Sequence, residues 1–535
     1  MTFASENSPV GSTANADKPK APAVKQAVVM IHGIGEQKPM DTIRNFVRAV
    51  WTTDTELVPE LKPHPLDKEG EDPKPQQIWS RPDRRTGSLE LRRLTTRKSK
   101  ESDSFPGGVR TDFYEFYWAD LTVGSTWRQV QDWIKGLLIR RPIKRVPSKV
   151  RLAWILLWFL SLLVFLLALA TALPKDATIF SIKVSSIIVP LQWLDRLETW
   201  QLAGLTALLG YLTHSFVVPY AGRVVRYTRA EPDNIAVRKN VRERGLELLR
   251  DLHTAEYNRI VLVGHSLGSI VAYDLVTYFW AERTKFRTIR KADTVEFPAL
   301  KDLARAADRL MKVYDAANGS AEDLRTAQQN FWNAQTKLGH LLRCRPKPKR
   351  NDANNPVPPE EDPRWIITDL VTLGSPLTHA EFLLAKSAED LEKRKAEREY
   401  PTSPPYREFQ DPDVGVEAQR AGLIESAQER RLFCYPVVGS AGSWRLDDGA
   451  PFGLVRWTNI YDPAWLVIFG DIISGSVAPA FGPGVRDINL KDRNGRWSRR
   501  FTHTLYWTNG AEGEVLPRIQ ALREALDLGG QRRIL

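Results

Sequence analysis

A serine bracketed by two glycines stands where an apolar run gives way to a small-residue helical pattern. Residues 259–274 read RIVLVGHSLGSIVAYD, which places Gly264 two residues before Ser266 and Gly268 two residues after it. In a Gly-x-Ser-x-Gly turn, small residues at these positions let a strand and the following helix approach closely, with the serine held at the bend. The strand-like run before the motif and the helical pattern after it supply this context. The pattern therefore predicts that Ser266 is a nucleophile.

A serine that attacks a carbonyl generates an oxyanion, which backbone N–H groups stabilise. A helix beginning at Leu267 directs its unpaired N–H groups toward that charge. The second donor in such sites comes from the loop after an earlier strand. Residues 27–37, AVVMIHGIGEQ, have this pattern, and Ile34 is the expected donor. We expect His32 and His265, which stand beside these turns, to be structural.

The nucleophile also needs a general base, which follows it in the chain order Ser, Asp or Glu, His. The histidines after Ser266 are His340, His379 and His503. His340 lies in a charged segment, and His379 comes too early to leave room for a strand that bears the acid. His503 lies after the last strand pattern and before the final helix, so we expect it to be the base.

The orienting acid should follow the strand predicted at 453–463, GLVRWTNIYDP. Asp462 comes directly after its apolar part, but beside Pro463 it is also a typical turn residue. Asp471 follows in the stretch GDIISG, after a short apolar loop. We favour Asp471, keep Asp462 as the alternative acid, and rank Asp487 third.

These residues require a scaffold that brings distant segments together. Apolar strand patterns alternate with helical ones, which predicts an α/β fold with a mostly parallel sheet and a site at the carboxyl ends of the strands. Strands are expected at 27–37, 88–95, 112–121, 259–265, 365–377 and 453–463, helices at 41–51, 231–253 and 514–526, and a loop at 60–86.

Two apolar stretches predict a membrane hairpin. Residues 153–173 contain no charged side chain and are long enough to cross a hydrocarbon core of ~30 Å as a helix, and residues 202–219 form a second candidate span. Basic clusters at 135–151 and 223–229 flank the pair, whereas the connecting loop is balanced in charge. By the positive-inside tendency, both arms are cytoplasmic. We therefore expect an integral membrane protein, in the inner or plasma membrane if it is bacterial.

Composition excludes several other classes. The 535 residues carry a net charge of +12, but the basic residues gather beside the first apolar stretch, and no nucleic-acid-binding motif is present. The only cysteines, Cys344 and Cys434, exclude a disulfide framework or a zinc cluster. No metal or nucleotide motif occurs, so we expect no cofactor and no nucleic-acid partner. The sequence does not identify protein partners.

The chain is thus divided by insertions. The expected organisation is a disordered tail at 1–24, a first part of the catalytic domain at 25–134, basic flanks with the hairpin at 135–230, the serine turn at 231–283, a charged helical insertion at 284–364, and a final part at 365–535 with a second insertion near 385–430.

The order of the motifs adds a resemblance. VVMIHGIGEQ, VLVGHSLGSIVAYD, VTLGSPL, WTNIYDP, GDIISG and HTLYW follow one another as in lipase-like serine hydrolases of the α/β-hydrolase superfamily. The chain is similar in this respect to GPI inositol-deacylase-like lipases and DDHD-type phospholipases, over about half of its length. The chain differs from these families in the loop after residues 453–463, because Trp465 stands where those families have their catalytic aspartate.

Together these features lead to one expected function and one alternative. The resemblance implies an α/β-hydrolase fold and a serine ester hydrolase. The predicted hairpin embeds this enzyme in a membrane, where we expect it to act on a lipid or another acyl ester at the surface of the bilayer. The alternative is a hydrolase fold without activity, which would serve as a membrane scaffold and bind partners through its charged insertions.

Overall fold

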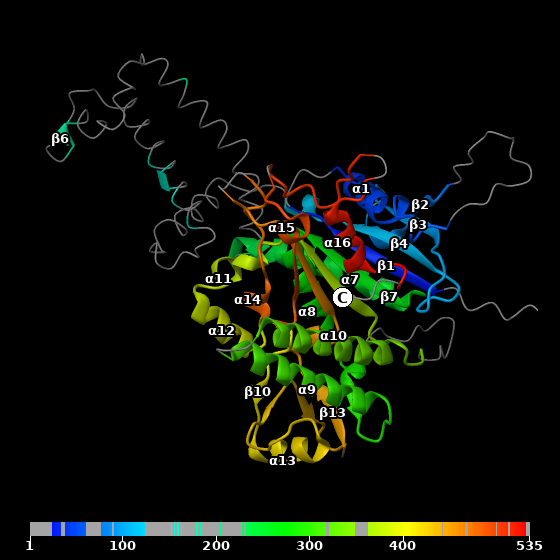
Figure 1. Ribbon diagram of the computed structural model, residues 1–535, viewed down its shortest axis with the longest axis vertical. Coiled ribbons are helices and arrows are strands. Elements are labelled where there is room, and N and C mark those ends of the chain that lie inside the picture. Colours follow the sequence, from blue (N-terminus) through cyan, green and yellow to red (C-terminus); the bar gives the residue numbers. More distant parts are fainter. Residues whose placement is uncertain are drawn as a thin grey trace, which may run out of the picture.

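The computed structural model describes twelve stretches of the chain, one of them only two residues long, and a few single residues and pairs between 151 and 204 (Figure 1). The stretches are 24–33, 38–59, 76–87, 90–122, 227–228, 232–316, 320–347, 362–440, 442–465, 469–498, 500–511 and 514–530. The expected tail at 1–24 and the expected oxyanion donor Ile34 fall outside these residues, except for Val24, which begins the first strand.

The largest sheet of the described residues has eight strands in the order β15-β14-β9-β7-β1-β4-β3-β2. The strands are β1 Val24–Ile31, β2 Ile78–Pro82, β3 Arg92–Lys98, β4 Val109–Phe116, β7 Arg259–His265, β9 Ile367–Leu373, β14 Arg456–Tyr461 and β15 Arg486–Asn489. The six strands from β15 to β4 are parallel, whereas β3 and β2 extend one edge in antiparallel pairing. The predicted α/β class with a mostly parallel sheet is confirmed.

Both faces of this sheet are buried. On β1, Ala27, Val29 and Ile31 enter one hydrophobic cluster, while Val28 and Met30 enter another on the opposite face. Helices α7 (Pro232–Thr254) and α8 (Gly268–Glu282) cover the first face, and α1 (Asp41–Val47) and α16 (Pro517–Leu526) cover the second. Because apolar side chains point both ways, these strands read as continuous apolar runs.

The strands at the two edges of the sheet have weaker sequence patterns than the central strands. β2 lies within residues 60–86, which were expected to be loop, so that prediction was wrong at 78–82. β15, with the sequence RDIN, carried no strand signal. Four of the five β2 residues are exposed, and such an edge strand is held mainly by backbone hydrogen bonds to its neighbour, which leave no apolar period in the sequence.

The segment at 284–364 forms a helical pair beside the sheet. Its helices are α9 (Glu296–Asp315) and α10 (Ala321–Arg343), which run together in Figure 1. The buried Gln335 of α10 donates from Nε2 to the carbonyl oxygens of Phe452 and Val455, at 2.7 and 3.0 Å. This hydrogen bonding attaches the insertion to the segment that leads into β14.

The remaining elements are short. They are β8 Thr288–Arg290, which pairs with β13 Ser443–Leu446 and through it with β12 Cys434–Pro436; β10 Glu408–Phe409 with β11 Arg431–Leu432; β5 Thr178–Ile179 with β6 Ile182–Lys183; and the helices α11 Ala380–Leu383, α12 Ala388–Ala396, α13 Pro412–Ala421, α14 Ala478–Phe481 and α15 Leu490–Asn494.

Within the described part of the chain, no helix is both long enough and apolar enough to cross a membrane. The spans expected at 153–173 and 202–219 lie outside the described residues, apart from isolated positions. The hairpin therefore stays a prediction.

Candidate active site

Ser266 sits in a tight turn between β7 and α8. Its backbone is left-handed, with φ of 52°, a conformation that is uncommon for a residue with a side chain and typical of strained functional turns. A methyl group on Gly264 would lie 2.6 Å from the Gly268 oxygen, and one on Gly268 would collide with the carbonyl oxygens of Ile31 and His32. Both glycines are therefore required by close backbone approach, as the motif predicts.

The loop after β1 passes directly beside the serine. A methyl group on Gly33 would lie 2.8 Å from Ser266 Cβ. Ile34 follows Gly33 but is outside the described residues, so its role as an oxyanion donor stays a prediction. For the Leu267 N–H, no acceptor occurs among the described residues, and α8 begins at the next residue. This N–H is available to a developing negative charge.

Three side chains from distant segments form a hydrogen-bonded row. Ser266 Oγ lies 2.9 Å from His503 Nε2, and His503 Nδ1 lies 2.9 Å from Asp471 Oδ2. A carboxylate only accepts hydrogen bonds, so His503 carries its proton on Nδ1 and presents the Nε2 lone pair to the serine hydroxyl. This is the arrangement that makes an imidazole a base for an adjacent hydroxyl.

The carboxylate of Asp471 is fully buried and held from several sides. Tyr506 donates its hydroxyl to Oδ2 at 2.7 Å, and the Ile473 N–H donates to Oδ1 at 3.0 Å. Burial alone would raise the pKa of Asp471, but the hydrogen bond and electrostatic attraction from His503, together with the hydrogen bonds from Tyr506 and Ile473, outweigh it, and its pKa is lowered. The pKa of Tyr506 is raised well above its ordinary value, first by burial and then by Asp471, so the phenol remains a donor.

A glycine at the end of β9 makes room for this pair. Gly374 has a φ of 57°, and a methyl group there would lie 2.9 Å from Asp471 Oδ2 and 2.7 Å from the Tyr506 ring. The sequence reading did not assign a function to Gly374 or Tyr506. Gly374 lies in the motif GSP and Tyr506 in the motif HTLYW, but neither motif indicates what these residues contact.

The other candidate acids serve the scaffold around the site. Asp462 Oδ2 accepts a hydrogen bond from the Ser498 hydroxyl and makes none with His503. Asp487, on β15, accepts from Asn459 Nδ2 and from the backbone N–H of Val477. The structure thus brings Asp471, rather than Asp462 or Asp487, to His503.

The remaining histidines near the chain's motifs have other surroundings. His340 lies on α10, in the insertion, and His379 ends a short 3₁₀ turn after β9. Ser375 caps that turn by accepting from the Leu377 N–H, which is a structural role.

His265 contacts the backbone of His503. Its Nε2 lies 2.7 Å from the carbonyl oxygen of His503, and since a carbonyl only accepts, this nitrogen carries the proton. Burial, followed by the neighbouring His503, lowers the pKa of His265 to about 3, so the ring stays neutral. His32 packs parallel to Trp118 and accepts from its backbone N–H. Both histidines are structural neighbours of the site, in line with the expectation.

No group of histidine, cysteine or acidic side chains that could hold a metal ion occurs in the part of the chain that the structure describes. Comparison with known proteins found no matching family model, curated protein or solved structure. The resemblance to lipase-like hydrolases therefore rests on the motifs and their order.

Proposed function

We propose that the protein is a serine ester hydrolase of the α/β-hydrolase type. The observation that carries this proposal is the row Ser266–His503–Asp471, with both hydrogen bonds at 2.9 Å and the serine in a left-handed turn before a helix. The parallel strands β7, β9 and β14 end at the same edge of the sheet, and the serine and the acid follow two of them. This placement is typical of sites in open α/β sheets.

In the proposed reaction, the Ser266 oxygen attacks the carbonyl carbon of an ester while its proton passes to His503 Nε2. The C=O bond electrons move to the oxygen, which the Leu267 N–H, and by prediction that of Ile34, stabilise. The tetrahedral intermediate collapses, the C–O bond to the alcohol breaks, and His503 returns the proton to the leaving oxygen. A water molecule, deprotonated by His503, then attacks the acyl-enzyme in the same way and releases the carboxylic acid product.

Asp471 has an orienting role in this scheme. Its carboxylate fixes the Nδ1–H tautomer of His503 and stabilises the imidazolium that forms. Tyr506 and the Ile473 N–H hold the carboxylate in turn. The chain supplies base, acid and nucleophile itself, and the proposed reaction needs no cofactor.

Active-site labelling tests the nucleophile directly. The purified protein should react covalently with a fluorophosphonate probe, because this reagent modifies serines activated by a neighbouring base. The Ser266→Ala variant should give no labelled band, whereas Ser375→Ala should label as the wild type does. Ser375 is a suitable control, because it is also buried and caps a turn.

The alternative function, an inactive fold that acts as a membrane scaffold, is favoured by one observation. Ser266 is only 4% exposed, so a substrate has little access to it in this conformation. Failure of the probe to label the wild-type protein, with or without lipid, would favour the scaffold over the enzyme.

We further propose that the substrate is a lipid or another acyl ester at a bilayer to which the hairpin anchors the protein, with the catalytic arms on the cytoplasmic side. The apolar stretch at 153–173 supports this. Four of its side chains, Ile155, Trp158, Phe159 and Leu162, are helical and exposed. Residues three and four apart lie on one side of an α-helix, so the spacing of these four positions fits an apolar face.

Removing the hairpin tests this part of the proposal. A protein in which 152–220 is replaced by a flexible linker should stay in solution without detergent and hydrolyse a short water-soluble ester at an undiminished rate. Its activity on long-chain lipid in vesicles should fall by about ten-fold or more, because the anchor no longer concentrates it at the surface. Equal activity of both proteins on vesicle lipid would remove the case for a membrane substrate.

A further inference from the structure

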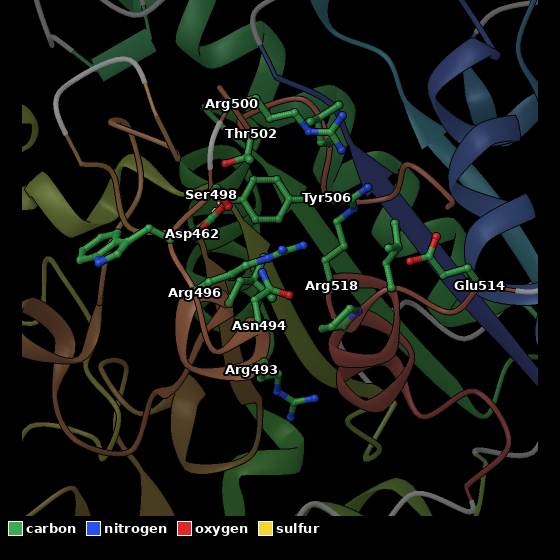
Figure 2. A pocket seen from close by; sticks show the side chains of 15 residues that line it. Asp462, Arg493, Asn494, Arg496, Ser498, Arg500, Thr502, Tyr506, Glu514 and Arg518 are labelled. Carbon is green, nitrogen blue, oxygen red and sulfur yellow. Dashed lines mark hydrogen bonds between the residues drawn. The ribbon is translucent and has the colours of Figure 1, made fainter. Parts of the chain in front are cut away.

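A cavity of about 640 Å³ lies on the other side of Tyr506, the residue that donates to Asp471 (Figure 2). Its walls come from Asp462, from the segment 490–506 that leads to and past His503, and from the start of α16. Tyr506 belongs to the wall and also donates to Asp471. Neither Ser266 nor His503 lines the cavity, so it is separate from the proposed ester site.

The lining of this cavity is strongly basic. It holds Arg493, Arg496, Arg500 and Arg518 against two acids, Asp462 and Glu514. Figure 2 shows the side chains of Arg496, Arg500 and Arg518 around the same space. Arg493 is engaged elsewhere, by an ion pair of 2.6 Å with Glu524.

The three remaining arginines keep donors that no group within the described ranges uses. In the described part of the chain, Arg496 and Arg500 form no ion pair. Arg518 donates from Nε and Nη2 to the Thr508 carbonyl oxygen, which leaves its Nη1 over. The pKa of Arg518 is lowered, first by burial and then by the positive charge of Arg500. Two guanidinium groups that repel one another are stabilised by an anion between them.

The N-terminus of helix α16 adds to the positive potential in the cavity. Leu516, Pro517 and Arg518 line the cavity and form the first turn of α16 with its cap. No side chain caps this end, since the cap residue is Leu516. The positive end of the helix dipole therefore faces the arginines, which favours a bound anion further.

Two buried polar atoms in the wall have no partner. The hydroxyl of Thr502, which is 8% exposed, and Oδ1 of Asp462, which is 2% exposed, make no hydrogen bond in the described structure. A buried polar group without a partner costs about 1–3 kcal/mol, so a ligand that bonds to both atoms would remove that cost. Thr502 offers a donor, and Asp462 offers an acceptor.

We infer that this cavity binds a phosphate ester that carries a hydroxyl group. The phosphate lies between Arg500 and Arg518, at the start of α16, and accepts from the Thr502 hydroxyl. The hydroxyl of the ligand donates to Asp462 Oδ1. The site goes beyond the proposed hydrolase and does not depend on Ser266. The same chemistry occurs in a soluble phosphate ester and in a lipid headgroup.

Calorimetric titration of the full-length protein tests the site, with glycerol 3-phosphate, inorganic phosphate and glycerol as probes. Glycerol 3-phosphate should bind most tightly, and Arg500→Gln should weaken it about ten-fold by removing a charge-assisted hydrogen bond. Thr502→Val, which keeps the side-chain shape, should weaken it about five-fold. Arg420→Gln should have no effect, because this exposed arginine lies on α13 and outside the cavity.

The variants also separate this inference from the proposed function. Ser266→Ala should bind glycerol 3-phosphate as the wild type does even if the protein hydrolyses nothing. Arg500 is exposed and its side chain makes no hydrogen bond in the described structure, so its replacement should leave folding intact.

Vesicles distinguish the two sources of the ligand. Binding to phosphatidylglycerol vesicles but not to soluble glycerol 3-phosphate, lost in Arg500→Gln and kept in Arg420→Gln, would assign the site to a lipid headgroup. Phosphatidylcholine vesicles control for binding through the apolar stretch. The inference fails if no probe binds saturably, or if Arg500→Gln binds as tightly as wild type. Equal affinity for inorganic phosphate would exclude the hydroxyl contact with Asp462.

Discussion

Replacing Ser266 or His503 with alanine is expected to lower the turnover of an activated ester by about 10⁴-fold or more. The first change removes the proposed attacking oxygen, and the second removes the proposed base, which lies 2.9 Å from it. Turnover should be measured with a p-nitrophenyl ester of short chain length. Far-ultraviolet circular dichroism should be unchanged, because neither substitution alters a backbone-determining residue of β7 or α8.

The double variant gives the sharper result. If His503 acts only by activating Ser266, the combined substitution should cost little more than either single one, because the members of such a unit are not additive. Multiplicative losses in the double variant would show that His503 is not the base for Ser266, and a wild-type rate in Ser266→Ala would end the proposal of a serine nucleophile.

Asp471→Asn is expected to lower turnover by about 10³- to 10⁴-fold with little change in substrate binding. An amide in place of the carboxylate presents an N–H to His503 or accepts weakly from it, and the Nε2 lone pair is no longer reliably directed at the serine. The buried site, in which Tyr506 and the Ile473 N–H also contact the carboxylate, leaves His503 no substitute partner of opposite charge. The measurement is kcat and KM on the same soluble ester.

Asp462→Asn provides the comparison for this result. Asp462 accepts from Ser498 and lies nine residues before Asp471, so its replacement should reduce folding yield more than turnover. If Asp471→Asn were as active as the wild type and Asp462→Asn inactive, the role of the acid would move to Asp462, and the loop would have to rearrange in the active conformation.

Local sequence patterns were sufficient to predict the elements that depend on neighbouring residues or on burial. The turn around Ser266 is specified by two glycines and an apolar run, because close approach of β7 and α8 admits no side chain there. The central strands β1, β7 and β9 were predictable for a related reason, since burial on both faces leaves continuous apolar runs. The edge strands β2 and β15 lack that burial on both sides, and their sequences do not reveal them.

The choice of acid was decided by the tertiary structure. Asp462 and Asp471 both follow β14, and the sequence favoured one of them without excluding the other. In the fold, the backbone N–H of Asp471 donates to the backbone carbonyl oxygen of Asp462 at 2.9 Å. Gly470 forms a β-bridge with Phe501, two residues before His503. That pairing fixes which carboxylate reaches the imidazole.

The sequence by itself thus determined the tight turn around Ser266, the choice of His503 as expected base and the parallel core of the sheet, because each depends on residues close together in the chain or on a burial pattern. Only the tertiary structure placed Asp471 against His503, set Tyr506 and Gly374 around the carboxylate, and gathered Arg500, Arg518 and Thr502 around one cavity. Those contacts join segments far apart in the chain, and no spacing along it encodes their distances.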